Sequence, residues 1–290
     1  MSAGVNAVYN LLNTMAGTSS LERALVLLKL IEQTPGGLTN AEISRRMKIP
    51  KSSCSYIVAH LEREGYLLRE TNSGRYKIGL TPLALAHGAL REVGIRTVAE
   101  PALYRLTTAT GLSAGIGVLD GGHVLLVDRV EGSRFVDRAL ESVSRTAHPY
   151  RVREQRDIGR KLPAHSTALG KVLLAHLPRQ QVNTVIAESG LHRITVKTIG
   201  SKARFLAELD SVRKQRYAIS DGETYMDLRA LSVPIFDADG LARAAVSVNG
   251  SPSDTVWHDL GQLVKIVQDA ARDISRRAGI LRLSASGIDS

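Results

Sequence analysis

The chain has 290 residues, of which 43% are hydrophobic, enough for two domains that each bury a core. Its formal net charge of +10 favours a polyanionic partner without proving one. A single cysteine excludes an internal disulfide framework and a cysteine-rich zinc module, and no apolar run reaches the about 18 residues of a membrane span. The N-terminus lacks a charged segment followed by an apolar one, so we expect a protein of the reducing cytoplasm.

The first 18 residues are rich in Ser, Ala, Gly and Asn and follow no sustained period. We therefore expect a mobile arm over residues 1–18. Ser19 or Ser20 then has the position of a helix N-cap, and this helix is expected to end before Pro35. The apolar face predicted for it consists of Leu21, Leu25, Leu28 and Ile31.

Residues 38–79 follow the pattern of two further helices and a hairpin. Thr39 and Glu42 have the spacing of a capping box, which opens a short helix. The apolar positions of this helix are Ala41, Ile43 and Met47. Pro50 is expected at the first position of the next helix, where its missing N–H costs nothing. The buried stripe predicted for that helix consists of Cys54, Ile57, Val58 and Leu61, with a redox-sensing Cys54 as the alternative to a core residue.

After Gly65 come two short extended runs, at 66–69 and 75–78, joined by the turn formers Asn72, Ser73 and Gly74. This pattern predicts a β-hairpin. Two helices at a tight angle followed by a hairpin form a winged helix-turn-helix, a shape that binds DNA. We therefore predict a DNA-binding domain over residues 19–80.

The N-terminal end of the second of these helices is the part expected in the major groove, where short polar side chains reach bases or phosphates. The predicted DNA contacts on it are Lys51, Ser52, Ser53, Ser55 and Tyr56. Backbone phosphates are the expected partners of four basic residues on the preceding helix and in the hairpin: Arg45, Arg46, Arg75 and Lys77. The alternatives are ordinary helix capping by the first two serines and a solvated helix face for the first two arginines.

The sequence pattern changes after the hairpin. Helical stretches at 83–93 and from 95 to about 110, separated by Gly94, are interpreted as a linker over residues 81–110. Beyond it we expect strands at 114–119, 123–130, 217–220, 228–236 and 242–249, and helices at 166–176, from 178, at 201–215 and at about 254–278. Hairpin-linked strands interleaved with helices predict an α+β domain on an antiparallel sheet over residues 111–282, followed by a tail at 283–290.

Several short blocks occur in a characteristic order along the chain. They are 20–25, Ile49-Pro50-Lys51-Ser52-Ser53, Gly65-Tyr66-Leu67, 74–80, Thr110-Gly111, 163–171 and 244–250. In this order the chain resembles the IclR-type family of bacterial transcriptional regulators. The resemblance implies a winged helix-turn-helix, a linker helix that pairs two chains and a GAF-like domain that binds a small effector. It also implies a homodimer or homotetramer on a double-stranded, (pseudo)palindromic DNA operator, acting as a repressor or dual regulator of a catabolic operon.

The resemblance places one wall of an effector pocket at a helix start, formed by backbone amides around Ala168 and Leu169. Free N–H groups and the positive end of the helix dipole suit a carboxylate there. The other walls that it implies are Ser220 or Asp221, Leu228, Ala230, Ser247 and Asn249. Apolar walls with a few polar groups suit a small organic or aromatic acid. The alternative for the last two residues is a solvent-facing position on their strand.

The chain departs from the family pattern in three places. Tyr56 stands where family members often have an arginine that reads guanine, and the acid pair of the family is displaced to Asp221-Gly222-Glu223. The segment 142–160 is longer than usual and carries Arg145, Arg151, Arg153, Arg156 and Arg160. We interpret it as a mobile loop, with a lid that contributes arginine to an anionic ligand, or an oligomer contact, as the alternatives.

An enzyme is the main alternative from another class of function. His165 and Ser166 with a distant Asp suggest a hydrolase, and Lys171 suggests a Schiff base. Neighbours in sequence rarely form a working Ser–His pair, however, and no Gly-x-Ser-x-Gly motif surrounds Ser166. The histidines show no metal-ligand spacing. We therefore expect no catalytic residue, metal or cofactor, and a DNA-binding protein without an effector is the second alternative.

The expected mechanism is that of a two-state regulator. Effector binding in the C-terminal domain alters how the linker helices of two chains pair. This changes the spacing of the two recognition helices relative to one helical turn of DNA.

Overall fold

The computed structural model describes residues 19–92, 94–134 and 158–278. The arm expected at 1–18, the tail expected at 283–290 and the arginines Arg145, Arg151, Arg153 and Arg156 lie outside the described residues. The chain forms two compact units, Met1–Glu92 and Val93–Ser290, and each is described by itself. No helix within the described ranges is long and apolar enough to cross a membrane.

The first unit has the architecture of a winged helix-turn-helix. Its described elements are α2 (Ser20–Glu32), α3 (Asn40–Met47), α4 (Lys51–Arg63), β1 (Leu67–Arg69), β2 (Tyr76–Ile78) and α5 (Thr81–Glu92). The hairpin is antiparallel, with Leu68 opposite Lys77. Leu38 forms a bridge with Tyr76, which ties the segment before α3 to the hairpin. The winged helix-turn-helix predicted from the sequence is confirmed.

Capping boxes open α2 and α3, as the sequence predicts. The Ser19 N–H donates to Glu22 Oε2 over 2.7 Å, and the Glu22 N–H donates to Ser19 Oγ over 3.2 Å. Thr39 and Glu42 make the same exchange over 2.8 and 3.3 Å. Pro50 is the N-cap of α4 rather than its first residue, because its ψ of 144° is still extended. The helix therefore begins one residue later than predicted.

The buried face of α2 differs from the predicted one. The buried residues of this helix are Val26, Leu27, Leu30 and Ile31. Leu21 and Leu25 are 70% and 52% exposed, and Leu28 is only partly buried. Apolar residues occur nearly all around α2, so the periodicity does not identify the face that packs. Ala41 of α3 is likewise exposed, in contrast to the prediction that it is a core position.

The apolar stripe of α4 is confirmed. Cys54, Ile57 and Val58 are buried, and Leu61 packs against the same core. Burial raises the pKa of the Cys54 thiol to about 11, so the thiol is protonated at neutral pH. Cys54 is therefore a small core residue.

The second unit is built on an antiparallel sheet of strand order β5-β4-β3-β8-β7-β6. The strands are β3 (Ser113–Asp120), β4 (His123–Val130), β5 (Lys161–Pro163), β6 (Ala218–Asp221), β7 (Arg229–Phe236) and β8 (Ala242–Gly250). Five of them match predicted strands. Strand β5 was not predicted, because three residues are too few to show an alternation of polar and apolar side chains. The α+β class is confirmed.

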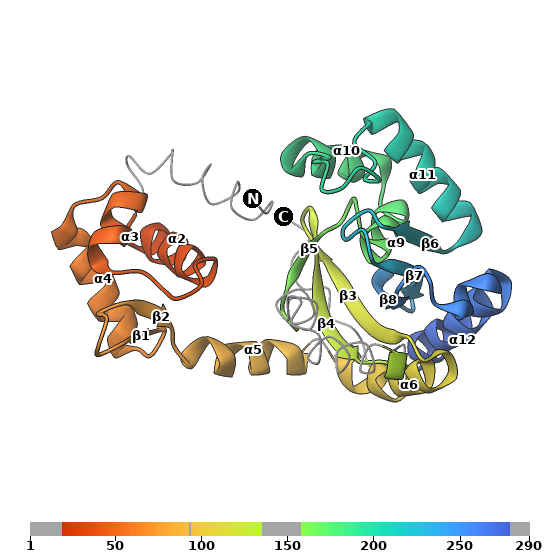
Figure 1. The fold of residues 1–290 in the computed structure, drawn as a ribbon, viewed down its shortest axis with the longest axis horizontal. Coiled ribbons are helices and arrows are strands. Elements are labelled where there is room, and N and C mark those ends of the chain that lie inside the picture. The colour runs from red at the N-terminus through yellow and green to blue at the C-terminus, as the bar shows by residue number, and fades with distance from the viewer. Residues whose placement is uncertain (1–18, 93, 135–157, 279–290) are drawn as a thin grey trace. The chain divides into compact units, whose positions relative to one another are not determined.

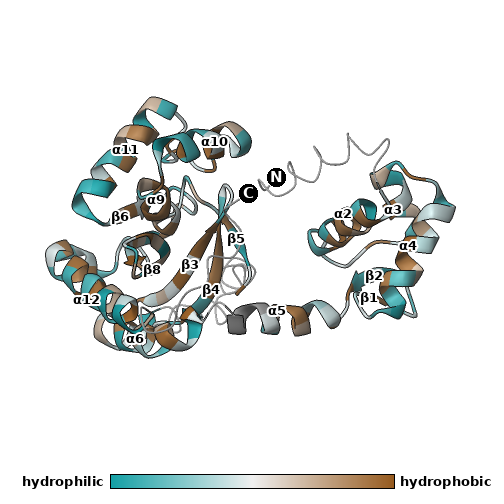
Figure 2. Cartoon of the chain, turned by 180° about the vertical axis from the view of Figure 1, so that it is seen from behind, coloured by the Kyte–Doolittle hydropathy of each residue, from teal (hydrophilic) through white to brown (hydrophobic). Residues whose placement is uncertain are grey.

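Helices cover both faces of this sheet. They are α6 (Ile95–Thr110), α9 (Ala168–Ala175), α10 (Arg179–Ser189), α11 (Lys202–Gln215) and α12 (Leu260–Ala278). In Figure 1, α6 and α12 lie on one side of the sheet and α9 on the other, with α10 and α11 beyond it. Figure 2 shows hydrophobic residues gathered along β3, β4 and α9. The last predicted helix, 254–278, is interrupted: a short 3-10 helix (Thr255–His258) precedes Asp259, whose ψ of 74° is not helical.

Helix α9 is buried along its whole length. A Cβ at Gly170 would clash with the backbone of Ala164, so glycine allows the helix to approach this segment closely. The side chain of Lys171 is 2% exposed, and its Nζ lies 2.5 Å from Glu223 Oε1 and 3.1 Å from Glu208 Oε1. Burial of the ammonium group is tolerated because carboxylates neutralise it. These contacts tie α9 to α11 and to the loop after β6.

The packing of α11 on α9 can be tested at Phe205, which is fully buried in their shared core. We predict that Phe205→Ala lowers the free energy of unfolding of the second unit by about 3–5 kcal/mol, through lost burial and a residual cavity. Urea denaturation followed by the fluorescence of Trp257, the only tryptophan of the sequence, measures this. The neighbouring, exposed Arg204→Ala is the control and should stay within about 0.5 kcal/mol of the parent. Equal stabilities of the two variants would contradict the packing.

Candidate functional site

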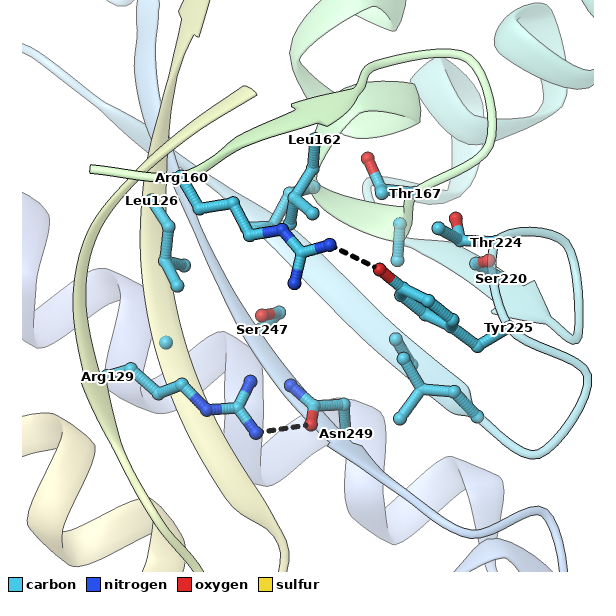
Figure 3. Close-up of a pocket in the computed structure, with 15 residues that line it drawn as sticks. Leu126, Arg129, Arg160, Leu162, Thr167, Ser220, Thr224, Tyr225, Ser247 and Asn249 are labelled. Carbon is cyan, nitrogen blue, oxygen red and sulfur yellow. Dashed lines mark hydrogen bonds between the residues drawn. The ribbon is translucent and has the colours of Figure 1, made fainter. Parts of the chain in front are cut away.

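The second unit contains a pocket between the start of α9 and the sheet. Seven of the residues predicted to bind an effector line it together: Ala168, Leu169, Ser220, Leu228, Ala230, Ser247 and Asn249. Leu126 and Leu162 add to its walls, which are mostly apolar. Figure 3 shows the polar side chains converging on this space from β4, β8, the residue before β5 and the loop after β6.

Asp221, also named as a candidate wall, does not line the pocket. Successive side chains of a strand point to opposite faces, so Ser220 and Asp221 cannot both face the same cavity. Ser220 is the one that lines it. The Asp221 carboxylate instead lies 3.2 Å from Lys197 Nζ and 3.7 Å from Arg229 Nε.

Eight lining residues were not predicted as effector contacts. They are Gly115, Leu126, Arg129, Arg160, Leu162, Thr167, Thr224 and Tyr225. Cross-strand register is the signal that could have found two of them, since Gly115 lies opposite both Arg129 and Ser247. Arg160 belongs to the arginine-rich segment for which an arginine directed at an anionic ligand was one alternative.

Among the described residues, two arginines and no acidic residue line the pocket. Arg160 Nη2 donates a hydrogen bond of 2.8 Å to Tyr225 Oη (Figure 3). The side chain of Arg129 is 8% exposed and pairs with Glu131, Nε to Oε1 over 2.8 Å and Nη2 to Oε2 over 3.2 Å. Arg129 Nη2 also donates to Asn249 Oδ1 over 3.3 Å. The two guanidinium groups therefore have different electrostatic surroundings.

Hydroxyl groups brace the turn that leads into α9. Thr167 Oγ1 caps the helix by accepting from the Gly170 N–H over 3.1 Å, and it donates to the Pro163 carbonyl over 3.1 Å. Ser220 Oγ donates to the Ser166 carbonyl over 2.7 Å. The start of α9 is thus held against β6, and its first residues form one wall of the pocket.

The residues considered for hydrolytic chemistry are not arranged for it. Ser166 Oγ is 2.9 Å from Thr224 Oγ1, whereas His165 Nε2 is 2.9 Å from the His192 carbonyl oxygen. Each side chain therefore has its own partner, and the histidine does not accept a proton from the serine. Burial lowers the pKa of His165, which keeps the ring neutral at pH 7.

Lys171 is a structural cation rather than a nucleophile. Besides its two carboxylate partners, its Nζ donates to the Ile219 carbonyl over 3.1 Å. Burial raises the pKa of Glu223, and the charge of Lys171 opposes this shift. Across the described part of the chain, no group of His, Cys, Asp or Glu side chains is arranged to hold a metal ion.

The first unit presents the predicted DNA contacts of α4. Lys51, Ser52, Ser55 and Tyr56 are exposed, and Ser53 is half-buried. Ser55 Oγ accepts from Asn40 Nδ2 over 2.6 Å, which ties α3 to α4. Tyr56 is 64% exposed, and its ring meets that of His60 edge-on, with centroids 4.4 Å apart. A large aromatic side chain thus lies on the surface of this helix.

The predicted phosphate contacts divide into two groups. Arg45 and Arg46 are exposed on α3, and Arg46 Nη1 donates to Thr34 Oγ1 over 3.2 Å. The hairpin residues have acidic partners within the unit, since Arg75 Nη1 is 3.1 Å from Glu42 Oε2 and Lys77 Nζ is 2.9 Å from Glu70 Oε1. A phosphate approaching the hairpin would therefore compete with these carboxylates.

Comparison with known families matches two models, in the order of the two units. The model described as "IclR helix-turn-helix domain" matches residues 20–71. The model described as "Bacterial transcriptional regulator IclR C-terminal" matches residues 136–276.

Curated relatives and solved structures agree with these matches. The transcriptional regulator KdgR of Dickeya chrysanthemi is 30% identical over 254 residues, 88% of this chain and 77% of its own. The regulator XynR of Escherichia coli K12 is 28% identical over 260 residues, 90% of this chain and 97% of its own. An IclR homolog from Microbacterium hydrocarbonoxydans, solved with 4-hydroxybenzoate, has a TM-score of 0.71 at 21% identity and covers 89% of this chain and 98% of its own.

The buried His165 and the half-buried His176 and His123, near α9, predict a pH dependence. Burial holds the pKa values of His165, His176 and His123 below the ordinary value of 6.5. The unfolded chain therefore binds these protons more readily, so their contribution to stability is complete above about pH 6.5 and is lost as the pH falls. We predict that the Tm of His165→Gln, which retains an N–H donor, falls less between pH 7.5 and 5.5 than that of the parent.

Differential scanning calorimetry at several pH values measures this slope. Glu223, whose pKa is raised, is present in both proteins and does not affect the comparison. The control His258→Gln changes an exposed histidine and should keep the slope of the parent. A His165→Gln slope as steep as that of the control would contradict a neutral, buried His165.

Proposed function

The chain belongs to the IclR family of bacterial transcriptional regulators, which bind DNA, and on this premise we propose that a small organic or aromatic acid in the α9 pocket controls its affinity for an operator. The observation that carries the proposal is a largely apolar pocket whose described lining residues include two arginines and no acidic residue. The solved homolog with bound 4-hydroxybenzoate shares the fold, and it makes that acid the first probe to use.

We propose that α4 is the recognition helix. The exposure of Lys51, Ser52, Ser55 and Tyr56 near its N-terminal end supports insertion of this end into the major groove. Ser53 is half-buried, and we assign to it a DNA contact made by its backbone or a contact with a flanking phosphate. Phosphate contacts are assigned to the positively charged residues around it: Arg45, Arg46, Arg75 and Lys77.

The proposed assembly is a homodimer or a homotetramer on a (pseudo)palindromic site. Exposed leucines on two helices of the first unit support it: Leu21, Leu25, Leu83 and Leu85 are each more than half exposed. Covering these exposed leucines with a second chain would remove their apolar surface from water and stabilise the assembly. Because a two-fold dimer presents two copies of α4, half-sites are expected about one helical turn apart.

The test of this function is whether small acids alter operator binding. Fluorescence anisotropy with the intergenic DNA beside the gene of this chain gives the operator affinity with and without each acid. The panel contains 4-hydroxybenzoate, gluconate and short keto acids. We expect at least one acid to change the affinity by about 5- to 150-fold, the usual range of allosteric coupling.

The same acid should raise the Tm of the full chain in the absence of DNA, because a ligand that binds the folded state stabilises it. If no acid changed either the operator affinity or the Tm, the chain would be a DNA-binding protein without a small effector.

The reading of bases by α4 is tested at Tyr56. We predict that Tyr56→Ala weakens binding to the operator by about 5- to 150-fold, equivalent to about 1–3 kcal/mol of base discrimination, with little change on unrelated DNA. Band-shift titrations on both DNAs measure this ratio. Leu241→Ala is the control, since Leu241 is a comparably exposed large side chain, at 49%, in the turn between β7 and β8. Equal losses on both DNAs would contradict a base-reading role.

A further inference from the structure

The hydroxyl groups at the α9 end of the pocket have few protons left for a ligand. Thr167 donates to the Pro163 carbonyl, and Ser220 and Thr224 donate to the Ser166 carbonyl over 2.7 and 2.9 Å. With their protons committed to the backbone, these oxygens offer mainly lone pairs to the cavity. An anion at this end of the pocket therefore needs donors from other groups.

Arg160 and Tyr225 supply those donors. Figure 3 shows the two side chains pointing toward each other across the pocket, near Thr167 and Thr224. Within residues 19–92, 94–134 and 158–278, the only hydrogen bond of the Arg160 guanidinium is the one to Tyr225 Oη, and no carboxylate pairs with it. A guanidinium presents paired N–H groups that match the two oxygens of a carboxylate. This end of the pocket thus carries one positive charge that a ligand can neutralise.

The Arg129 end is different because its charge is already balanced. Both oxygens of Glu131 accept from Arg129, whose side chain is nearly buried. A second ligand carboxylate here would approach Glu131 in a poorly solvated region, and this repulsion disfavours binding.

Neutral donors and acceptors are nevertheless available at the Arg129 end. Asn249 Oδ1 accepts from Arg129, which directs the Nδ2 protons of the amide toward other acceptors. Ser247, 4% exposed, lines the same region with its hydroxyl. An amide donor beside a hydroxyl suits an uncharged hydroxyl or carbonyl oxygen of a ligand.

Building on the proposed effector function, we propose that the pocket selects a singly charged hydroxy or oxo carboxylic acid. Arg160 and Tyr225 bind its carboxylate, and Ser247 and Asn249 bind the neutral oxygen at its other end. Leu126, Leu162 and Leu228 pack against the ring or chain between the two ends. Arg160 is the residue that determines specificity for the negative charge.

Isothermal titration calorimetry on the full chain tests, with matched probes, whether the pocket prefers ligands with one negative charge. The aromatic series is 4-hydroxybenzoate, the dianion benzene-1,4-dicarboxylate and the neutral 4-hydroxybenzamide. The aliphatic series is gluconate and the dianion glucarate. In at least one series, the monoanion should bind at least about tenfold more tightly than the dianion, and 4-hydroxybenzamide should bind weakly or not at all.

The role of Arg160 is tested with the monoanion that binds. Arg160→Met should weaken binding by about 10- to 150-fold, the range for a hydrogen bond to a charged group. Arg160→Lys keeps the charge without the forked donors and should be intermediate. Arg204→Met removes one charge from an exposed position outside the pocket and should bind like the parent. If Arg160→Met did not fold, the probe series on the parent and Arg160→Lys would still decide the question.

The outcomes separate this inference from the function on which it rests. A dianion that binds as tightly as its monoanion, or an Arg160→Met chain with parental affinity, would overturn the proposed selectivity for one negative charge. Binding of 4-hydroxybenzamide in preference to the acids would do the same. The proposed effector-sensing function would still stand. If none of the probes bound the parent chain, both the proposed selectivity for monoanions and the proposed acid-sensing function would be contradicted.

Discussion

The complete burial of α9 is the constraint on which the second unit depends. A helix without an exposed face has to approach its neighbours closely, and Gly170 allows it to reach the backbone of Ala164. The same burial forces the charge of Lys171 to be neutralised from two directions, by Glu223 and Glu208. The first turn of α9 is thereby held over the sheet. The pocket is the space that remains between that turn and the strands.

Some arginines are paired with carboxylates of the chain and stabilise the fold, whereas Arg160 faces the pocket, where a ligand can reach it. Arg129 and Arg75 have carboxylate partners, Glu131 and Glu42, and stabilise the sheet and the contact between hairpin and α3. Arg160 has only a phenol as its described partner and faces a cavity. The net charge of +10 is therefore less informative than the surroundings of each cation. An unneutralised guanidinium in an apolar pocket indicates an anion more directly than overall basicity does.

Local sequence signals predicted where the helices and most strands lie. They did not predict which face of a helix is buried, because that depends on tertiary packing. Capping boxes and turn residues act within a few positions, so the starts of α2 and α3 could be predicted from sequence. The face of α2 could not, because leucines occur around most of its circumference and tertiary contacts choose among them. The choice between Ser220 and Asp221 could not be made from sequence, because the side-chain parity of a four-residue strand cannot be assigned before its neighbours are known. Arg160 needed the short strand β5, which carries no periodic signal, to bring it to the pocket.

We propose that the acid pocket and helix α4 are two sites of one equilibrium. Coupling between binding sites is reciprocal, so an acid and an operator must change each other's affinity by the same factor. The most direct measurement is calorimetric titration of the tightest-binding acid into the full chain, alone and saturated with operator DNA. Reciprocal coupling predicts that operator DNA shifts the affinity for the acid by the same factor, about 5- to 150-fold, by which the acid shifts operator affinity. An acid affinity that operator DNA leaves unchanged would contradict it.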